Sequence, residues 1–401
     1  MNEPDGSFKP GRDFAVALDR GDPLGRFRDE FHVPRSGNGE EEIYFVGNSL
    51  GLLPKRTSKY VEEELEKWKR LAVKAHFSGE NPWMPYHELL AEPMARLVGA
   101  SASASASASM SEVVTMNSLT VNLHLMMASF YRPTRERHRI LLEDHAFPSD
   151  DYAVESQAVV HGFDPAEALV RLRPGEGHHS IEMTDVAEVL DREGESIALV
   201  LLPGVQYYTG QAFDMEAITH LAHAKGCLVG FDLAHAAGNL VLRLHDWNVD
   251  FAVWCTYKYL NSGPGSVGGC FVHERHGRRP DLPRLAGWWG HDKESRFRME
   301  PGFRPIFGAE GWQLSNPPIL SLAAIRASLD VFMEAGGMDP LREKSVRLTA
   351  YLEWLLQREI GDSVEILTPG DPRRRGCQLS FRVKSNVSGR TVLEKLEGAG
   401  V

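Results

Sequence analysis

The chain has 401 residues, of which 42% are hydrophobic and 25% charged, so it is long enough for a large core and two domains. Its net charge of -11 argues against a general nucleic-acid-binding protein, which would carry a basic face. The N-terminus has no secretory pattern, and no apolar stretch approaches the ~20 residues of a membrane span, so we expect a cytoplasmic protein with no membrane partner. The four cysteines lack CxxC spacing, so we expect a reducing compartment and no metal site.

The first hundred residues predict an irregular N-terminal segment followed by helices. Residues 1–42 are polar and broken by Pro and Gly, with a short helix expected over 13–24. An apolar run predicts a strand at 43–46, followed by a turn. Amphipathic patterns predict helices at 58–73 and 86–97. A strict Ser/Ala alternation at 101–109 has nothing to anchor a core, and we interpret it as a connector without chemistry.

From residue 112 to about residue 269, short apolar runs alternate with helical segments. The predicted strands are 113–116, 139–142, 197–202 and the runs that end at Asp232 and Thr256. The predicted helices are 120–131, a segment that begins near Ser149, and 217–225. Alternating strands and helices predict an α/β fold whose mostly parallel sheet is covered by helices.

The C-terminal part predicts a smaller α/β domain. An aromatic and basic loop at 280–318 is followed by predicted helices at 319–333 and 341–359, strands at 365–367 and 377–383, and a helix at 391–396. We therefore predict a large domain at 44–318 and a small domain formed by 1–43 and 319–401. The β-β-α pattern stops before another strand, so we expect the C-terminal part of the small domain to be incomplete.

A lysine in an unusual position is the strongest chemical signal. Lys258 follows the apolar run 251–254, between Tyr257 and Tyr259. Lysine is nearly always solvated, and one placed where a buried strand ends has an amine that can form a Schiff base with an aldehyde. The alternative, a lysine that extends its charge out of a strand end, is about equally favoured by this segment alone.

A second strand end favours the chemical interpretation. Asp232 ends the apolar run that precedes it, and His235 follows three positions later. Ligands gather at the carboxyl ends of strands in a parallel sheet, so Asp232 and Lys258 would face one crevice. A lysine for an aldehyde and a carboxylate for a pyridinium nitrogen are what pyridoxal phosphate requires. A helix N-cap is the alternative role for Asp232.

Two further strand-to-helix junctions carry polar side chains. Ser118 and Thr120 lie where a helix N-terminus could bind phosphate, although simple N-capping is favoured by that motif alone. Phe147 could stack on a flat ring, and Ser149 and Asp150 could either bind a cofactor or cap the next helix. Farther on, the adjacent indoles at 288–289 indicate an interface or ligand pocket, and 315–318 has the composition of a turn.

Seven motifs in order resemble one family. The runs 44–51, 117–124, 147–150, 208–210, 231–235, 257–261 and 315–318 are similar to those of kynureninases, which are pyridoxal-phosphate enzymes of the aspartate-aminotransferase (type I) fold. The resemblance spans roughly residues 40–400.

The resemblance implies a role for each matching residue. Lys258 would hold the cofactor and act in catalysis together with Tyr257. The implied cofactor-binding residues are Leu119, Thr120, Phe147, Pro148, Ser149, Asp150, Asp232, His235, Tyr257, Lys258, Trp288 and Asn316. The implied substrate-binding residues are Ser49, His76 and Asn316. Trp288 and Asn316 resemble residues that this family places at the site across a homodimer interface.

The implied reaction is hydrolysis of L-kynurenine or 3-hydroxy-L-kynurenine, a small-molecule substrate, to anthranilate or 3-hydroxyanthranilate and L-alanine. This reaction belongs to tryptophan catabolism and NAD biosynthesis. Two departures from the family pattern stand out. Pro203 stands where family members often have a serine, and the chain stops before a family segment that supplies an arginine for the substrate carboxylate. We therefore expect a truncated chain that binds cofactor but turns over weakly.

Two other interpretations stay open from the sequence. The chain could be another type I pyridoxal-phosphate enzyme, such as a desulfurase or an aminotransferase. A desulfurase needs a reactive cysteine on a mobile loop, which neither Cys270 nor Cys377 fits well. The chain could also be a non-catalytic subunit that keeps the cofactor residues.

Overall fold

The computed structural model describes residues 8–101, 111–384 and 387–401. Its centre is a seven-stranded sheet in the order β3-β9-β8-β7-β6-β4-β5. The strands are β3 (Val113–Thr115), β4 (Arg139–Glu143), β5 (Leu169–Leu172), β6 (Ile197–Pro203), β7 (Leu228–Asp232), β8 (Phe251–Trp254) and β9 (Gly269–Val272). Neighbours from β5 to β8 are parallel, and only β9 pairs antiparallel with β8 and β3. The mostly parallel sheet is thus confirmed.

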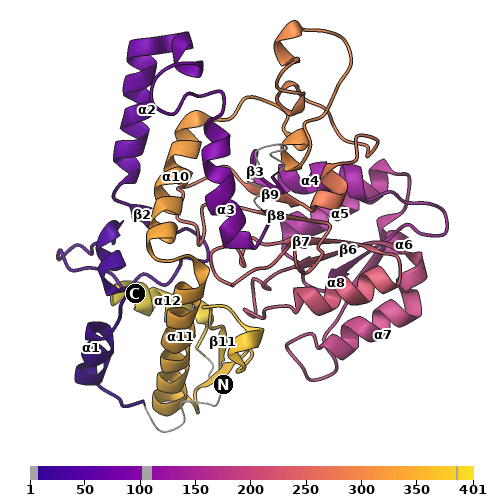
Figure 1. Cartoon of the computed structure of the whole chain (residues 1–401). Coiled ribbons are helices and arrows are strands. Elements are labelled where there is room, and N and C mark those ends of the chain that lie inside the picture. The colour runs from indigo at the N-terminus through magenta and orange to yellow at the C-terminus, as the bar shows by residue number, and fades with distance from the viewer. Residues whose placement is uncertain (1–7, 102–110, 385–386) are drawn as a thin grey trace.

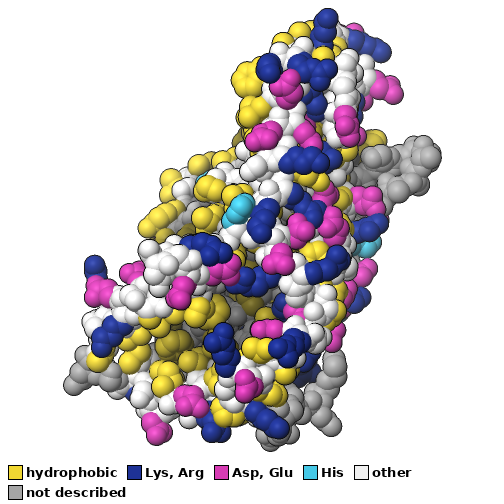
Figure 2. All heavy atoms as spheres, turned by 90° about the vertical axis from the view of Figure 1, so that its left-hand side faces the viewer, with side chains coloured by type: hydrophobic (Ala, Val, Ile, Leu, Met, Phe, Trp, Pro, Cys, Tyr) yellow, Lys and Arg dark blue, Asp and Glu magenta, His cyan; other side chains and the backbone are white. Residues whose placement is uncertain are grey.

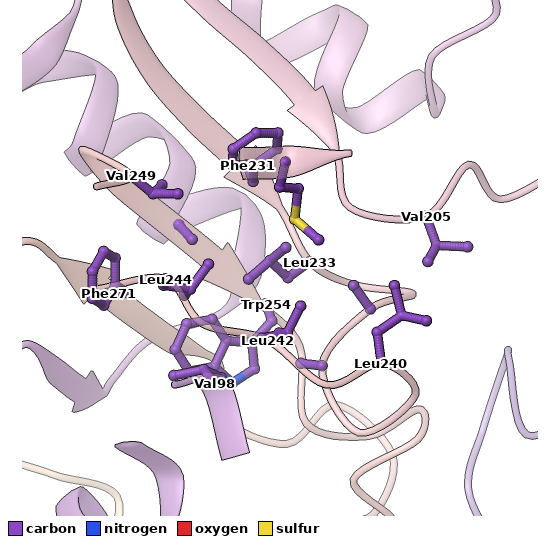
Figure 3. Packing of buried hydrophobic residues seen from close by; sticks show 14 of the residues in the cluster. Val98, Val205, Phe231, Leu233, Leu240, Leu242, Leu244, Val249, Trp254 and Phe271 are labelled. Atoms are coloured by element: carbon purple, nitrogen blue, oxygen red, sulfur yellow. The ribbon is translucent and has the colours of Figure 1, made fainter. Parts of the chain in front are cut away.

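The strands form because their side chains are apolar on both faces of the sheet. Along β4, Leu141 belongs to one buried cluster, whereas Ile140 and Leu142 belong to the other. This two-residue alternation is the geometry of a strand between two layers of helices. Figure 3 shows part of the first cluster, where Phe231 and Leu233 lie near Trp254 and Phe271.

Helices cover both faces of the sheet (Figure 1). The cluster that contains Leu141 also holds residues of α3 (Ala91–Val98), α7 (Met183–Glu193), α8 (Met215–Ala224) and α10 (Ile319–Glu334). The cluster that contains Ile140 holds residues of α4 (Leu119–Phe130) and α5 (Pro148–Val160). The short helices α6 (Pro165–Ala168) and α9 (Glu274–Gly277) lie before β5 and after β9.

Two glycines let the sheet close around large aromatic rings. A Cβ atom on Gly230 would overlap the ring of Phe251 on the neighbouring strand, and one on Gly269 would overlap the indole of Trp254. Both strands would have to separate to accept a side chain at these positions. The two glycines therefore fix how closely β7, β8 and β9 approach one another.

The rest of the chain packs beside this sheet. The N-terminal part has α1 (Arg12–Arg20), α2 (Thr57–Leu71) and a small antiparallel pair of β1 (Phe31–His32) and β2 (Leu53–Pro54). The C-terminal part has α11 (Met338–Ile360), α12 (Gly389–Gly398) and the antiparallel pair β10 (Val364–Ile366) and β11 (Phe381–Val383). The division into domains at 44–318 and its flanks stays a prediction.

Several element predictions need correction. Residues 43–46 are not a strand, and Ile43 instead donates its backbone N–H to the carbonyl of Gly400, which joins the two ends of the chain. The helix expected over 86–97 begins as a 3₁₀ turn, η3 (Tyr86–Leu90), before α3. Most of the strand expected over 377–383 is irregular, and only its last three residues pair. The Ser/Ala run falls largely outside the described residues.

The surface carries both hydrophobic and charged side chains. Figure 2 shows hydrophobic side chains gathered in a hollow among charged ones, on the face that lies at the left of Figure 1. Among the residues that the structure describes, none of the helices is both long and apolar enough to cross a membrane.

Candidate active site

A cavity of about 150 Å³ opens where four parallel strands end. Nine residues predicted from the sequence line it: Leu119, Thr120, Phe147, Ser149, Asp150, Asp232, His235, Tyr257 and Lys258. Five others complete the lining: Glu143, Pro203, Val205, Tyr207 and Ala234. The loops after β4, β6, β7 and β8 supply most of these groups, as expected for a site at the carboxyl edge of a parallel sheet.

Lys258 lies at the centre of this cavity. Its Nζ is 3.0 Å from Nε2 of His235, 5.7 Å from the centre of the Phe147 ring and 6.0 Å from that of Tyr257. Burial, followed by the charge of Lys258, lowers the pKa of His235 to about 3, so the imidazole is neutral at ordinary pH. The lysine amine therefore donates to a neutral ring nitrogen. The other nitrogen of that ring, Nδ1, is buried and has no hydrogen-bond partner among the described residues.

Asp232 and Asp150 form a buried carboxyl pair. Asp232 ends β7, and its Oδ1 accepts the backbone N–H of Ala234 at 2.7 Å. Burial and the charge of Asp232 raise the pKa of Asp150 well above its usual range, and burial also raises the pKa of Asp232. Two adjacent carboxyls in a dry site share one proton. We assign that proton to Asp150, because the backbone N–H stabilises the charge of Asp232.

Glu143 is a third carboxyl, which the sequence analysis missed. It ends β4, has a relative exposure of 3%, and lines the cavity. Burial raises the pKa of this carboxyl to about 8, although a hydrogen bond from its own backbone N–H partly opposes the rise. The signal was present in the sequence, since a polar residue ends an apolar strand there just as Asp232 does.

The first turn of α4 borders the same cavity. In the described part of the chain, the side chain of its N-cap residue, Ser118, makes no capping bond, so the first backbone N–H groups of the helix lack that usual partner. The hydroxyls of Thr120 and Ser149 lie 2.8 Å apart at this end. Free N–H groups, a helix dipole and two hydroxyls form an environment suited to a phosphate. The simple capping role considered for Ser118 is therefore not supported.

Aromatic side chains form one wall. The Phe147 ring packs edge-on against Tyr207, with 5.3 Å between the ring centres, and it is 46% exposed. Burial raises the pKa of Tyr257 to about 12, so this residue is a neutral phenol. Pro148, which was predicted as a cofactor contact, is the first residue of α5 and does not line the cavity.

Four other predicted residues lie outside the cavity lining. Ser49 belongs to a turn that reaches the site indirectly, because Gly51 donates its N–H to the carbonyl of Tyr257 at 2.8 Å. His76 lies edge-on to Trp83, with 5.3 Å between ring centres. Trp288 contacts Phe297, and Asn316 is exposed. One chain alone therefore does not bring these four to Lys258.

The residues that do meet fit pyridoxal phosphate. The group needs an amine, a carboxylate for its ring nitrogen, an aromatic face and an anion site. Lys258, Asp232, Phe147 and the first turn of α4 match these needs in one pocket. Within residues 8–101, 111–384 and 387–401, Oδ1 of Asp150 and Nδ1 of His235 are buried without a hydrogen-bond partner, which indicates that further polar groups of a ligand belong here.

Comparison with protein families agrees with this chemistry. Residues 107–401 match the family described as aminotransferase class-V. The chain is 57% identical to a kynureninase from Koribacter versatilis, over 98% of this chain and 91% of the relative. It is 55% identical to kynureninases from Myxococcus xanthus, over 98% and 90%, and Stenotrophomonas maltophilia, over 97% and 90%.

Solved structures resemble the fold at much lower identity. A C-DES mutant with glycine covalently linked to its PLP cofactor has a TM-score of 0.74 and 17% identity, over 93% of this chain and 90% of that chain. The cysteine desulfurase from Thermococcus onnurineus has a TM-score of 0.69 and 16% identity, over 96% and 86%. At these identities the likeness concerns the fold alone.

Proposed function

Because the chain belongs to the kynureninase family, within the class-V aminotransferases that use pyridoxal phosphate, we propose that it hydrolyses L-kynurenine or 3-hydroxy-L-kynurenine. The products would be anthranilate or 3-hydroxyanthranilate, together with L-alanine. The observation that carries the proposal is the meeting of Lys258, His235 and Asp232 with the free first turn of α4 in one cavity. The resulting role lies in tryptophan catabolism and NAD biosynthesis.

Residues of the chain would contact the cofactor at its aldehyde, its ring nitrogen, its ring face and its phosphate. Lys258 would bind its aldehyde, Asp232 its ring nitrogen and Phe147 its face, while Asp150 donates its proton to Asp232. The phosphate would lie against the backbone of Leu119 and the hydroxyls of Thr120, Ser149 and Tyr257. When bound, pyridoxal phosphate supplies an electron sink for negative charge that develops beside the substrate amine.

Proton movement would fall to Lys258 and Tyr257. The Lys258 amine, released when the substrate amine takes its place, would remove the proton on the substrate α-carbon. Neutral His235 supports this step, because it accepts a hydrogen bond from Nζ without adding a competing positive charge. Tyr257, as a neutral phenol, would pass a proton to or from the water that attacks the γ-carbonyl.

The remaining predicted residues would act in a homodimer. Trp288, Phe297 and Phe77 form an exposed row of rings with 5.5 Å and 6.2 Å between neighbouring centres. Phe297 is 52% exposed and Phe77 is 64% exposed, which is unusual unless another surface covers them. We place this row at the subunit interface, where Trp288, Asn316, His76 and Ser49 would reach the partner's cavity to bind substrate. Light scattering of the purified chain tests this assembly.

A cytoplasmic location and a small-molecule substrate complete the proposal. The alternative of a cysteine desulfurase has less support, because that chemistry needs an activated thiol. Burial raises the pKa of all four thiols, to about 11 for Cys255. Cys377 is exposed as a residue, but its thiol faces Tyr259.

The decisive experiment is to incubate the chain with pyridoxal phosphate and L-kynurenine and to follow anthranilate by fluorescence. Lys258→Ala tests the nucleophile, and Lys59→Ala, which changes a lysine of α2 whose side chain is 76% exposed, is the control. Anthranilate from the wild type and from Lys59→Ala, but not from Lys258→Ala, is the expected result. A cofactor-loaded wild type that forms no anthranilate from either substrate would contradict the proposal.

A further inference from the structure

Three potential metal ligands converge at the edge of the sheet opposite the cavity. Glu112 precedes β3, His245 lies in the loop between β7 and β8, and His273 follows β9. Since β9 runs antiparallel to β8, its end lies beside the amino ends of the parallel strands. The closest ligand atoms of the three residues lie within 4.8 Å of one another. The proposed function uses none of them.

The separations suit a common cation. Oε1 of Glu112 lies 3.0 Å from Nδ1 of His245 and 3.7 Å from Nδ1 of His273. Two ligands bound tetrahedrally to zinc, at distances of about 2.0–2.2 Å, would be separated by roughly 3.3–3.6 Å. The two imidazole rings are nearly parallel, with 13° between their planes and 5.0 Å between their centres. Because an imidazole lone pair lies in the plane of its ring, one of the two rings would have to turn for both nitrogens to meet at one cation.

The carboxylate is held as a metal ligand is usually held. Glu112 has a relative exposure of 1%, and its oxygens accept the backbone N–H groups of Ser101 and Glu274, each at 2.7 Å. Such outer contacts fix the orientation of a ligand and raise metal affinity. The His245 side chain is 34% exposed, which leaves a route from solvent to the cluster.

Two hydrogen-bond acceptors of the cluster lie close together. Nδ1 of His273 accepts the backbone N–H of Arg275 at 3.2 Å, so this nitrogen carries a lone pair and no proton. That nitrogen and Oε1 of Glu112 are two acceptors only 3.7 Å apart. A bound cation would replace their repulsion with two bonds, at the cost of the hydrogen bond from Arg275. His245 donates to the same carboxylate, so its proton stands where a metal would bind.

A second cluster in the described part of the chain shows what argues against a metal. His87, Glu88 and Glu310 also bring their ligand atoms together, but Nζ of Lys293 lies 2.9 Å from Glu88 Oε1 and 2.6 Å from Glu310 Oε2. A lysine already neutralises those carboxylates. Among the described residues, no lysine or arginine forms an ion pair with Glu112, whose ionic partners there are the two histidines.

We propose that Glu112, His245 and His273 form a binding site for a divalent transition metal of the zinc type, which ties the β3 edge to β9 and to the loop before β8. Two imidazoles and a carboxylate are a typical zinc ligand set, with a fourth position left for water. The site would stabilise the fold and would not depend on the substrate or the cofactor.

The test uses Co²⁺ and Zn²⁺ as probes on the purified, cofactor-loaded chain after treatment with a chelator. We expect one Co²⁺ per chain, visible ligand-field absorption that Zn²⁺ abolishes, and a higher melting temperature with Zn²⁺. His245→Gln keeps a donor to Glu112, and His273→Asn keeps an acceptor for Arg275, yet each should lower metal affinity at least tenfold. The control is His178→Ala. This histidine is exposed and adjacent to His179 in sequence, and its replacement should leave metal binding unchanged.

Several results would overturn the site: no uptake, uptake unchanged in both ligand variants, or uptake lost in His178→Ala. If His273→Asn does not fold, His245→Gln decides alone, because that side chain is partly exposed. Melting temperatures measured with chelator show whether a variant is itself destabilised. None of these readouts requires turnover, so they stand apart from the proposed hydrolysis of kynurenine.

Discussion

Nε2 of His235 accepts a hydrogen bond from Nζ of Lys258 at 3.0 Å, while Nδ1 of the same ring is buried and finds no partner in the part of the chain that the structure describes. The imidazole is therefore fixed by one polar contact and by packing. A ring held in this way keeps the Lys258 amine pointing toward Nε2 of His235. It also leaves one nitrogen available to whatever group enters the cavity.

Replacing His235 should alter the acid stability of the cofactor-free chain. The folded pKa of about 3 lies below the ordinary value, so protons bind the unfolded state more readily, and stability is lost as pH falls from about 6.5 toward 3. His235→Gln removes this loss, which amounts to roughly 2–3 kcal/mol at about pH 4.5. Urea unfolding midpoints at pH 7 and 4.5 measure it. Equal acid losses in wild type and variant would show that the ring protonates freely in the folded chain.

Glu143 should act in the opposite direction. Its folded pKa of about 8 lies above that of an ordinary glutamate, so its contribution to stability is complete below pH ~4 and is lost as pH rises through about 8. The free energy of unfolding of Glu143→Gln, compared with that of the wild type, should thus be higher at pH 9 than at pH 4 by roughly 3–5 kcal/mol.

Unfolding of the cofactor-free chain across this pH range measures the Glu143 effect. Exposed Glu136, changed to Gln, is the control and should follow the wild type. A wild type and Glu143→Gln with parallel pH profiles would mean that the buried carboxyl ionises without cost.

The two aspartates should differ in their response to amidation. Asp150 is the protonated partner, so an asparagine there can still donate to Asp232, and Asp150→Asn should lose about tenfold in activity or less. Asp232→Asn removes the negative charge that the ring nitrogen needs, and we expect a loss of about 10²-fold or more. Turnover, together with the absorption spectrum of the bound cofactor, compares them. The reverse ranking would place the charge on Asp150.

A methyl group on Gly230 should disrupt the sheet. Its Cβ would overlap the Phe251 ring on the adjacent strand, and we expect Gly230→Ala to cost about 3 kcal/mol or more. Gly37→Ala is the control, since a Cβ there has nothing within 4 Å and should change stability by less than about 0.5 kcal/mol. Chemical denaturation midpoints test both. A stable Gly230→Ala would mean that Phe251 can turn aside.

The site was predicted best where a polar residue follows an apolar strand, because the carboxyl ends of parallel strands lie together at one edge of the sheet. Apolar runs that end in Asp232 and near Lys258 predicted two strands, and β7 and β8 are indeed neighbours with their ends together. The same rule would have found Glu143. The roles carried over from the family resemblance for Ser49, His76, Trp288 and Asn316 stay predictions, because these residues lie away from the cavity of a single chain.

Local pattern failed where distant contacts decide the structure. Residues 43–46 have the composition of a strand but form none, and the backbone N–H of Ile43 bonds instead to the carbonyl of Gly400, which follows α12. The antiparallel strand β9 was not predicted, because its short apolar run begins with glycine. That glycine is needed for close packing on Trp254, a requirement visible only in three dimensions.

The pairing of β3 with β9 has a consequence for the order of folding. Strands β4, β6, β7 and β8 can join one after another as the chain proceeds, but β3, which comes first in the sheet sequence, waits for β9, which comes last. Helix α4 follows β3 directly, so the phosphate end of the cavity is completed only at this late, non-local step. Capture of the cofactor would therefore report that the whole sheet has closed, and a nascent chain released before β9 should fail to retain it.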